Sequence, residues 1–566
     1  MICNSYFNNN EVLREDISDV IFDDILSLFD GTAETYKKVQ RQWFRLWMSS
    51  GISLTDLCNE WYRITRPNWL GWTTFPQPDI ASTDPTTSSN GVKGGDNAEM
   101  VCIPSTAFVA NRDDYSGNPL FAVTIVNWEL DPASGKKIIT AIKGISEDFE
   151  QDNPLKYVGC MQMTGYVLQK DNDQDYVFYY TDNPSAMTNL EPLAEAVEPD
   201  GTINNFVLHS KYMNSTVNNK MTTCSGLVPS VNNSHNNNIT LSNANGSFYS
   251  GSCICDISFL KIMTYIKYAS LTQDNRIQGC LTYNIQKYAQ IAENDTNRII
   301  LTPADAEDYK IGSTVLIGTY DSTNKLDRSK STVYNISGQT GFIIVNKENI
   351  TINENSYVAL ILNVESTNLF TTVANGNAIA GTTIVSTWHW VTGTNDDVLG
   401  NDGSYDLPAS GIYPAMIQGI EYSVGGWEVL TDTILKYDSG MCTPVISNKK
   451  AYQATSINSN MVYSNIQVSC PSTSSYCYIR KQEYKNGVMF PVDVSGGSSA
   501  TFSKDAIYLL NSSSTSSNEV LAFGSLYSGV SYYGLSCVNG SSALSSTYWT
   551  SLGRLSPNGN RGEFEA

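Results

Sequence analysis

The sequence predicts an α+β protein that is mostly β and rich in loops, and its composition supports this fold class in three ways. Charged residues make up only 16% of the 566 residues, 33 tyrosines outnumber 18 phenylalanines, and Gly, Asn, Ser and Thr are abundant. Tyr and Thr favour strands, whereas Gly, Asn and Ser favour turns. An apolar content of 41% is enough to fill cores, so the composition is not that of a disordered chain.

Residues 1–70 predict a short N-terminal helical region. Apolar residues recur at three- and four-residue steps between positions 16 and 66, which is the helical period. Gly31 and Gly51 interrupt the pattern, so we expect three short helices, the last of them capped by Ser53. The predicted helices carry Trp43, Trp47 and Trp61. We expect them to pack between the helices; the alternative is a surface that forms an oligomer.

Residues 71–252 predict a β-rich middle domain with long loops. The stretch NPLFAVTIVNWELDPASGKKIITAIKGI contains two alternating segments around a Pro-Ala-Ser-Gly turn, which is a hairpin pattern. The stretch KYVGCMQMTGYVLQKDNDQDYVFYYTD repeats the pattern, with its turn between Asp171 and Asp175. Residues 184–252 are rich in Asn and Ser and predict loops around one short strand, NNFVLHSKY.

One conspicuous helix and one inserted domain are predicted next. The helix is predicted in the stretch DISFLKIMTYIKYASLTQDNRIQGCLTYNIQKYAQI, and Asp256 or Ser258 can cap it. Its predicted apolar face is Phe259, Ile262, Met263, Ile266 and Ala269. Residues 297–370 contain short alternating segments joined by Asp, Asn and Gly turns, which predict a small β-barrel. This barrel would be inserted into a larger domain made of residues 253–296 and 371–566.

Four segments of the sequence resemble a known family. They are the opening segment, ISFLKIMTYIKYASLTQDNRIQGCLTYN, IILTPADAEDYKIGSTVLIG, and TWHWVTGTNDDVLGNDGSYDLPASGIYPAMIQGIEYSVGGWEVLTDTIL. In this order they resemble structural proteins of tailed bacteriophages and prophages with a C-terminal C-type-lectin-like fold. The formylglycine-generating enzyme and variable phage tropism determinants share that fold. The resemblance covers roughly residues 257–556 and weakens toward the N-terminus.

Two blocks make the resemblance specific. In that family a GxYPxxxxGIExxxGGxExLxD stretch is the central helix-loop-strand hallmark. The matching residues here are Gly411, Tyr413, Pro414, Gly419, Ile420, Glu421, Gly425, Gly426, Glu428, Leu430 and Asp432. The family's closing segment is matched by Phe523, Gly524, Tyr527, Gly529, Gly553, Arg554 and Leu555. The resemblance therefore implies a C-type-lectin-like domain interrupted by the inserted barrel.

The lectin-like fold has three known uses, and two of them need a particular set of metal-binding residues. An oxidase needs a copper-binding cysteine pair; Cys470, Cys477 and Cys537 are the candidates, but the active-site context is missing. A calcium-dependent lectin needs clustered carboxylates; Asp396, Asp397, Asp402 and Asp406 could bind a cation or form an ordinary acidic loop. The histidines, His209, His235 and His389, are too scattered for a metal triad. We expect no catalytic residue, no metal and no cofactor.

The third use is recognition by a loop surface, and the closing segment favours it. Residues 520–553 contain no charged side chain and are rich in Tyr, Ser, Gly and Asn, the composition of antibody paratopes. By position in the resembling family, the predicted contact residues are Tyr527, Val530, Tyr532, Tyr533, Ser536, Val538, Asn539, Ser542 and Leu544. Phe523, Gly524, Gly529, Trp549 and Gly553 would be scaffold. The alternative is that half of the tyrosines are buried between loops.

Charge and hydropathy limit the partners. With 35 basic and 56 acidic residues the net charge is -21, which argues against nucleic-acid binding because phosphate contacts need clustered Lys and Arg. No run of 18 apolar residues is present, so we expect no membrane insertion. No secretory signal is visible, which favours reduced cysteines in a protein made in a cytosol.

The resemblance implies a phage virion structural protein, assembled in the host cytoplasm. It would be a subunit of a tail or head fibre or adhesin, presenting a lectin-like face to the host surface without catalysis, and attached to the particle through its N-terminal helices. The expected partners are other virion structural proteins and a bacterial cell-surface glycan or protein, with a homo-oligomer, a trimer by analogy. One alternative is a purely structural decoration or connector protein of the capsid or tail. A more distant alternative is a glycan-degrading tail spike.

Overall fold

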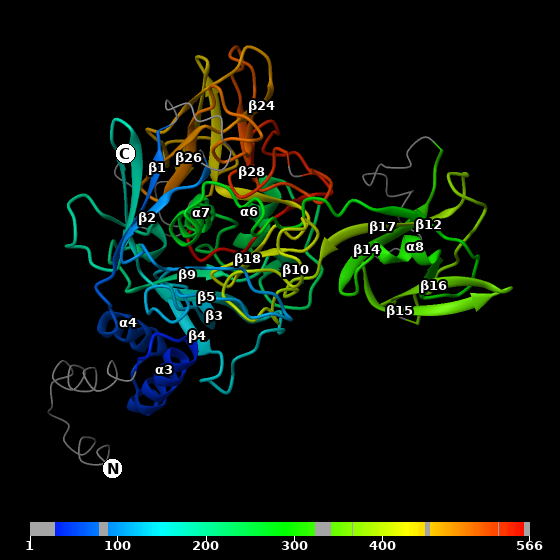
Figure 1. The fold of residues 1–566 in the computed structure, drawn as a ribbon, viewed down its shortest axis with the longest axis horizontal. Coiled ribbons are helices and arrows are strands. Elements are labelled where there is room, and N and C mark those ends of the chain that lie inside the picture. The colour runs from blue at the N-terminus through cyan, green and yellow to red at the C-terminus, as the bar shows by residue number, and fades with distance from the viewer. Residues whose placement is uncertain are drawn as a thin grey trace.

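The computed structural model describes residues 29–77, 89–322, 341–364, 366–447, 453–529 and 531–559. Within these residues the protein is mostly β, with several antiparallel sheets and a few helices, which confirms the predicted mostly-β class. Figure 1 shows a main body and a lobe that protrudes from one side of it. No helix in the described part of the chain is long and apolar enough to cross a membrane.

Two N-terminal helices, α3 (Ala33–Trp47) and α4 (Leu54–Ile64), form where the sequence predicts them. The hydroxyl of Ser53 accepts a hydrogen bond from the backbone N–H of Asp56, so Ser53 is the predicted cap of α4. Trp43 and Trp61 are buried and their rings lie 5.5 Å apart, so these tryptophans pack inside rather than form a surface. A short 3-10 turn, η1 (Met48–Ser50), follows α3. The predicted helix at residues 16–28 lies outside the described residues.

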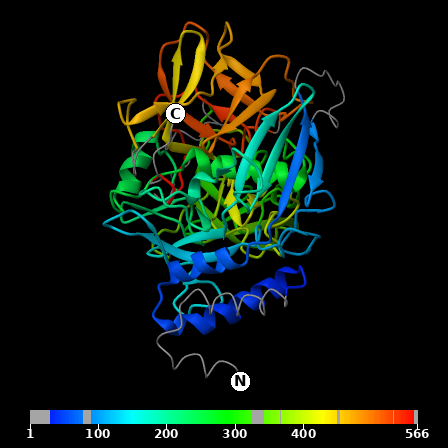
Figure 2. The same ribbon diagram turned by 90° about the vertical axis from the view of Figure 1, so that its left-hand side faces the viewer.

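A four-stranded sheet with the order β4-β3-β5-β9 lies directly against these helices. Figure 2 shows the two blue helices as a layer at one end of the molecule, below this sheet. The strands of this sheet are β3 (Thr124–Leu130), β4 (Lys137–Ile142), β5 (Tyr157–Met163) and β9 (Phe206–Ser210). β3 and β4 are the first predicted hairpin, and β9 is the predicted strand NNFVLHSKY.

A five-stranded sheet with the order β2-β1-β7-β6-β8 continues the middle region. Its strands are β1 (Leu70–Pro76), β2 (Val92–Gly95), β6 (Tyr166–Asp171), β7 (Asp175–Thr181) and β8 (Glu191–Pro192). β6 and β7 form the predicted hairpin, with its turn between Asp171 and Asp175. The preceding strand of the same predicted segment, β5, pairs instead with β3 and β9 in the other sheet.

Residues 184–252 contain more regular structure than the one strand that their sequence predicts. Besides β9 they form the 3-10 turn η2, the hairpin β10–β11 and the helix α6. The bounds of these elements are η2 (Ala194–Ala196), β10 (Ser215–Val217), β11 (Lys220–Thr222) and α6 (His235–Asn243). Helix α6 has almost no apolar periodicity in HNNNITLSN, and its cap Ser234 and its burial against β20 stabilise it instead.

The conspicuous helix, α7 (Ile254–Tyr268), is buried on every side rather than on one apolar face. Asp256 takes part in its cap, as predicted, by accepting a bond from the backbone N–H of Cys253. Ser258 does not cap the helix, because its hydroxyl donates to the carbonyl of Ile254 one turn earlier. Lys267, in the last turn, is fully buried and forms an ion pair with Asp402 at 2.8 Å.

The protruding lobe is a six-stranded sheet with the order β12-β17-β14-β15-β16-β13 and a hydrophobic core of its own. Its elements are β12 (Gln286–Tyr288), β13 (Arg298–Leu301), α8 (Pro303–Glu307), β14 (Ser313–Thr319), β15 (Phe342–Ile352), β16 (Asn355–Leu362) and β17 (Thr383–Trp390). The lobe therefore contains the predicted insertion 297–370 together with the flanking strands β12 and β17. The backbone N–H of Gln290 donates to the carbonyl of Ile300, which joins the two edge strands of the sheet.

A nine-stranded sheet forms the end of the molecule that lies opposite α3 and α4 (Figures 1 and 2). Its main path is β22-β21-β20-β28-β29-β27-β24, and β23 and β30 pair with β21 and β20. The bounds are β20 (Trp427–Asp438), β21 (Met441–Ser447), β22 (Met461–Tyr463), β23 (Val468–Ser469), β24 (Ser475–Tyr478), β27 (Ala506–Leu509), β28 (Ser517–Ala522), β29 (Val538–Asn539) and β30 (Ser551–Leu552). A separate hairpin is β25 (Lys481–Lys485) with β26 (Val488–Asp493).

The predicted helix-loop-strand hallmark contains no helix in this structure, in which residues 411–432 are all described. It forms the hairpin β18 (Ala415–Ile417) and β19 (Ile420–Tyr422), followed by the long strand β20. The turn needs a left-handed backbone at Gln418 and Gly419, which breaks any helix. The largest hydrophobic core draws buried side chains from Tyr36 to Leu555, so the helical, middle and C-terminal regions pack on one another.

Candidate recognition site

A cluster of partly exposed tyrosines at the far edge of the nine-stranded sheet is the candidate recognition site. Tyr476 and Tyr478 are two residues apart on β24, so both side chains leave the same face of the sheet. The ring of Tyr532 stacks on both, at 5.3 Å from Tyr476 and 5.4 Å from Tyr478. The ring of Tyr533 meets Tyr476 edge to face at 5.5 Å. We call Tyr476, Tyr478, Tyr532 and Tyr533 the tyrosine platform.

Backbone contacts hold the loop of the tyrosine platform against β27. The backbone N–H of Ala506, the first residue of β27, donates to the carbonyl of Tyr532 at 2.8 Å. The backbone N–H of Ser536 donates to the carboxylate of Asp505 at 2.7 Å. Tyr533 also packs edge to face on buried Trp427, at 5.5 Å. The platform is thus fixed before any partner binds, which reduces the entropy lost on binding.

The platform is neutral and amphipathic. Burial raises the pKa of the Tyr476, Tyr478 and Tyr533 phenols, so their hydroxyls stay protonated. The hydroxyl of Tyr533 donates to that of Tyr476 at 3.2 Å, which orders the two rings. Tyr532 is the most exposed member, at 38%. Such a surface can stack on a flat apolar face and donate hydrogen bonds at its rim.

The structure brings part of the predicted contact set together on this surface. Tyr532 and Tyr533 belong to the platform, and the amide of Asn539 donates to the hydroxyl of Tyr476 at 3.4 Å. Tyr527 is 59% exposed but packs near Trp549, in a separate aromatic group that includes Trp388. Val530 lies outside the described residues.

Four predicted contact residues are buried and do not reach the surface. They are Ser536, Val538, Ser542 and Leu544. Val538 lies in β29, and its side chain packs in the largest hydrophobic core. Leu544 packs in a cluster with Ile434 and Val445. Their burial corrects the contact role predicted for these four residues.

Sequence reasoning missed Tyr476 and Tyr478. Tyr476 lies in the segment CPSTSSYC and Tyr478 directly follows it, but this segment was considered only for Cys470 and Cys477, which are partly exposed free thiols in this structure. The alternation of Tyr476, Cys477 and Tyr478 is a strand pattern that could have placed both rings on one face. Only the pairing of β24 with β27 brings them beside Tyr532, more than 50 positions along the chain.

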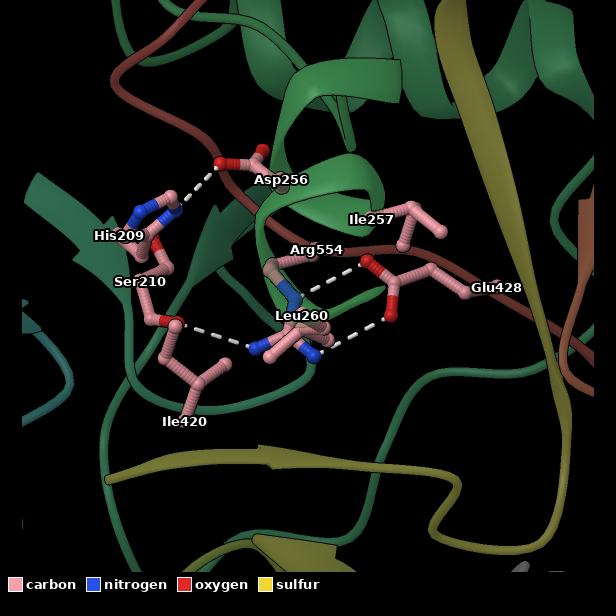
Figure 3. Close-up of a pocket in the computed structure, with 8 residues that line it drawn as sticks. All are labelled: His209, Ser210, Asp256, Ile257, Leu260, Ile420, Glu428 and Arg554. Atoms are coloured by element: carbon pink, nitrogen blue, oxygen red, sulfur yellow. Dashed lines mark hydrogen bonds and ion pairs between the residues drawn. The ribbon is translucent and has the colours of Figure 1, made fainter. Parts of the chain in front are cut away.

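The two sequence blocks behind the family resemblance meet in a buried charged centre (Figure 3). Arg554 of the closing block and Glu428 of the hallmark block form a two-pronged ion pair, with N–O distances of 3.0 and 3.1 Å. The guanidinium also donates to the carbonyl oxygens of Ser210 and Glu421. In the same region the Nδ1 atom of His209 lies 2.9 Å from a carboxylate oxygen of Asp256. A cavity of about 10 Å³ between these side chains has room for one water molecule.

This centre ties the fold together rather than presenting a reactive group. Arg554 and Glu428 are 2% and 0% exposed. Glu195, His209 and Asp256 lie close enough to hold a cation. The carboxylate of Asp256, however, already accepts bonds from His209, Ser556, Asn558 and the backbone of Cys253. Four donors to one carboxylate satisfy it without an ion.

Two of the four aspartates in the acidic loop at residues 394–406 have partners within the protein. Asp396 lies 3.3 Å from the ammonium of Lys211 and accepts a bond from the hydroxyl of Tyr212. Asp402 pairs with Lys267 and accepts from the hydroxyl of Tyr268 at 2.9 Å. These two carboxylates therefore neutralise buried lysines.

The remaining histidines are buried in separate places. The ring of His235 lies between the carbonyl oxygens of Leu430 and Ala454. The ring of His389 contacts the carbonyl of Trp549.

Neither comparison with known proteins adds an identification: the scan against protein-family models and the search of curated proteins both find no match.

Proposed function

We propose that this protein is a virion structural protein of a tailed phage that recognises a bacterial cell surface through the tyrosine platform, without catalysis. The observation that supports recognition most directly is the platform itself: stacked, neutral, partly exposed rings on a rigid sheet edge. Rigid tyrosines offer a large contact area at a low cost in conformational entropy. The bound partner would be a surface glycan or protein.

The arrangement of the molecule is compatible with attachment at one end and recognition at the other. The helices α3 and α4 lie at the end opposite β24 (Figures 1 and 2). In the proposed arrangement these helices attach to other virion structural proteins, and copies of the chain assemble as a homo-oligomer, a trimer by analogy. Light scattering of the purified chain measures that oligomeric state.

A C-type-lectin-like fold for the C-terminal region is part of the proposal. Support comes from two helices, α6 and α7, that pack on the long strand β20, and from the ion pair between the two resembling blocks. Helix α6 begins at residue 235, so the proposed domain extends N-terminal of the predicted boundary at 253. The lobe around β14–β16 interrupts it.

The test is binding of the fluorescently labelled full chain to a panel of bacterial cells, measured by flow cytometry. The key variant replaces Tyr532 and Tyr533 by Ala. The matched control replaces Tyr463, which is 51% exposed on β22 and outside the platform. We expect wild type and the Tyr463→Ala variant to bind the same strains, and the double variant to lose most of that binding.

Equal binding by all three proteins would remove the platform as the contact surface. Failure of every protein to bind any strain would instead favour the decoration or connector role. Loss of glycan from bound cells would favour the tail-spike role.

A further inference from the structure

Two loops of the main body expose five large apolar side chains. Residues 103–109 contribute Ile103, Phe108 and Val109, and residues 399–407 contribute Leu399 and Leu407; each is between 47% and 65% exposed. We call these five residues the apolar loop surface. Single exposed apolar residues are common, but monomeric soluble proteins rarely group several of them in one place.

Backbone hydrogen bonds hold the two loops side by side. The N–H of Leu399 donates to the carbonyl of Thr106 at 3.1 Å. The N–H of Ala107 donates to the carbonyl of Tyr405 at 3.0 Å. Within the first loop the N–H of Thr106 donates to the carbonyl of Val109 at 2.9 Å. Apolar side chains from segments that are far apart in the chain therefore form one surface.

A row of aromatic rings connects this surface to the hydrophobic core. The ring of Phe108 meets that of Tyr405 edge to face at 5.4 Å. Tyr405 lies 6.1 Å from Tyr413, and Tyr413 lies 5.0 Å from buried Trp390. Phe108 is thus exposed but held in place from below. An aromatic side chain that is fixed in this way is typical of the residues that dominate binding at interfaces.

The backbone at Leu407 is an independent observation. Its φ is +46°, in the left-handed region, which residues with a Cβ adopt at a cost in free energy. The side chain stays largely exposed, so packing within one chain does little to offset this cost. Strained residues tend to occur at functional sites. Contact with apolar atoms of another molecule supplies the packing that Leu407 lacks within its own chain.

The apolar loop surface is large enough to be the centre of an interface. At these exposed fractions the five side chains together present roughly 400–500 Å² of accessible surface. A standard interface buries about 800 Å² per partner, of which about 57%, or about 450 Å², is non-polar. The five side chains therefore supply about the whole apolar area that one partner of a stable complex contributes.

The chemistry of the surface favours a second copy of the chain as the partner. None of the five side chains carries a charge or a hydrogen-bonding group, so the matching surface is one that is equally apolar. Rotational symmetry brings the same surface of another copy against it. Interfaces of permanent homo-oligomers are also more apolar than those of transient complexes.

We propose that the apolar loop surface is the contact between copies in a homo-oligomer, in which Phe108 and Leu407 of one copy pack against the same surface of another. The inference rests on the homo-oligomer that is part of the proposed function. It does not depend on recognition by the tyrosine platform.

Light scattering of the full chain over a dilution series tests the contact. We expect wild type to associate, and Phe108→Ser/Leu407→Ser to raise the dissociation constant about a hundredfold, because two central apolar side chains are lost. The matched control is Leu155→Ser, since Leu155 is 75% exposed in a different loop; it should associate like wild type. Circular dichroism should be the same for all three proteins, because the replaced side chains are exposed.

Photochemical cross-linking locates the partner without destabilising the contact. With p-benzoylphenylalanine at position 108, ultraviolet light should join two chains, which a denaturing gel separates from single chains. Mass spectrometry should find the attached peptide within residues 103–109 or 399–407 of the second copy. Cross-links confined to one chain, for example to residues 1–28, would mean that the chain covers its own surface and would overturn the proposal. Cross-links to a different face of the second copy would overturn it as well.

Failure of this inference and failure of the proposed recognition are distinguishable. A wild-type chain that stays monomeric, or a Phe108→Ser/Leu407→Ser variant that associates as tightly as wild type, would overturn the interface and leave recognition by the platform untouched. The Tyr532→Ala/Tyr533→Ala variant should associate like wild type. If that variant also binds cells like wild type, the recognition function fails and the interface remains.

Discussion

Replacement of Arg554 by Met should strongly destabilise the main body. The guanidinium is buried and makes two bonds to Glu428 and one each to the carbonyl oxygens of Ser210 and Glu421. Removing one partner of a buried ion pair costs about 3–5 kcal/mol, because it leaves the other charge buried and uncompensated. The two carbonyl oxygens also lose a charged donor, so we expect the upper half of that range.

The matched control is Arg112→Met. Arg112 also forms an ion pair with an aspartate, Asp114 at 2.7 Å, but its side chain is 60% exposed. Exposed pairs of this kind contribute little to stability, because water and salt screen the two charges. Urea unfolding followed by tryptophan fluorescence measures both variants, and the Arg554 variant should unfold at a clearly lower urea concentration.

A second variant separates the charge from the packing. Adding Glu428→Gln to Arg554→Met removes the orphaned carboxylate, so the double variant should be more stable than Arg554→Met alone by about 2 kcal/mol. The reasoning is refuted if Arg554→Met costs no more than Arg112→Met. It is also refuted if the second substitution recovers no stability.

Three further changes test other parts of the structure. Burial raises the pKa of Glu519 to about 8. Its contribution to stability is therefore present in acid and is lost as the pH rises from about 4.5 to about 8, by up to about 5 kcal/mol. Glu519→Gln should flatten that slope in melting temperatures measured at pH 5 and pH 8.5. Leu544→Ala should lower the free energy of unfolding by about 2–4 kcal/mol, because it opens a cavity in a buried cluster. If the variant is as stable as wild type but binds cells less well, the predicted contact role of Leu544 is restored. Gly403 pairs with both Ser105 and Met416. Gly403→Ala should disrupt this pairing, because φ is +153° and a Cβ would collide with the backbone of Ser105. A melting temperature equal to that of wild type would contradict this steric account.

The sequence by itself predicted the features that depend on local patterns. Alternation of apolar residues around turn residues located β3–β4 and β6–β7, and the helical period located α3 and α4, with Ser53 as a cap. Alternating strands also located the protruding lobe, although its sheet includes β12 and β17 beyond the predicted limits. These patterns act over a few residues, so they can be recognised without knowledge of the fold.

Other features were decided by contacts between segments that are far apart in the chain. Helix α6 has a polar sequence and forms because it is capped by Ser234 and packed on β20. The same Tyr-, Ser- and Asn-rich composition around residue 536 is exposed at Tyr532 and buried at Val538. Val538 packs in the largest hydrophobic core, whereas Tyr532 stacks on the partly exposed rings of Tyr476 and Tyr478. Composition describes what a segment can do, but burial depends on which strand becomes its neighbour.

The uncharged closing segment shows this division most clearly. Its sequence alone determined that it would be neutral and rich in tyrosine. The tertiary structure decided that Tyr532 and Tyr533 lie beside Tyr476 and Tyr478. It also decided that four of the nine predicted contact residues are buried. Arg554, just after this segment, forms its ion pair with a glutamate 126 positions earlier. Long-range strand pairing and buried charge pairing are set by the three-dimensional packing of the whole chain, and no local pattern encodes them.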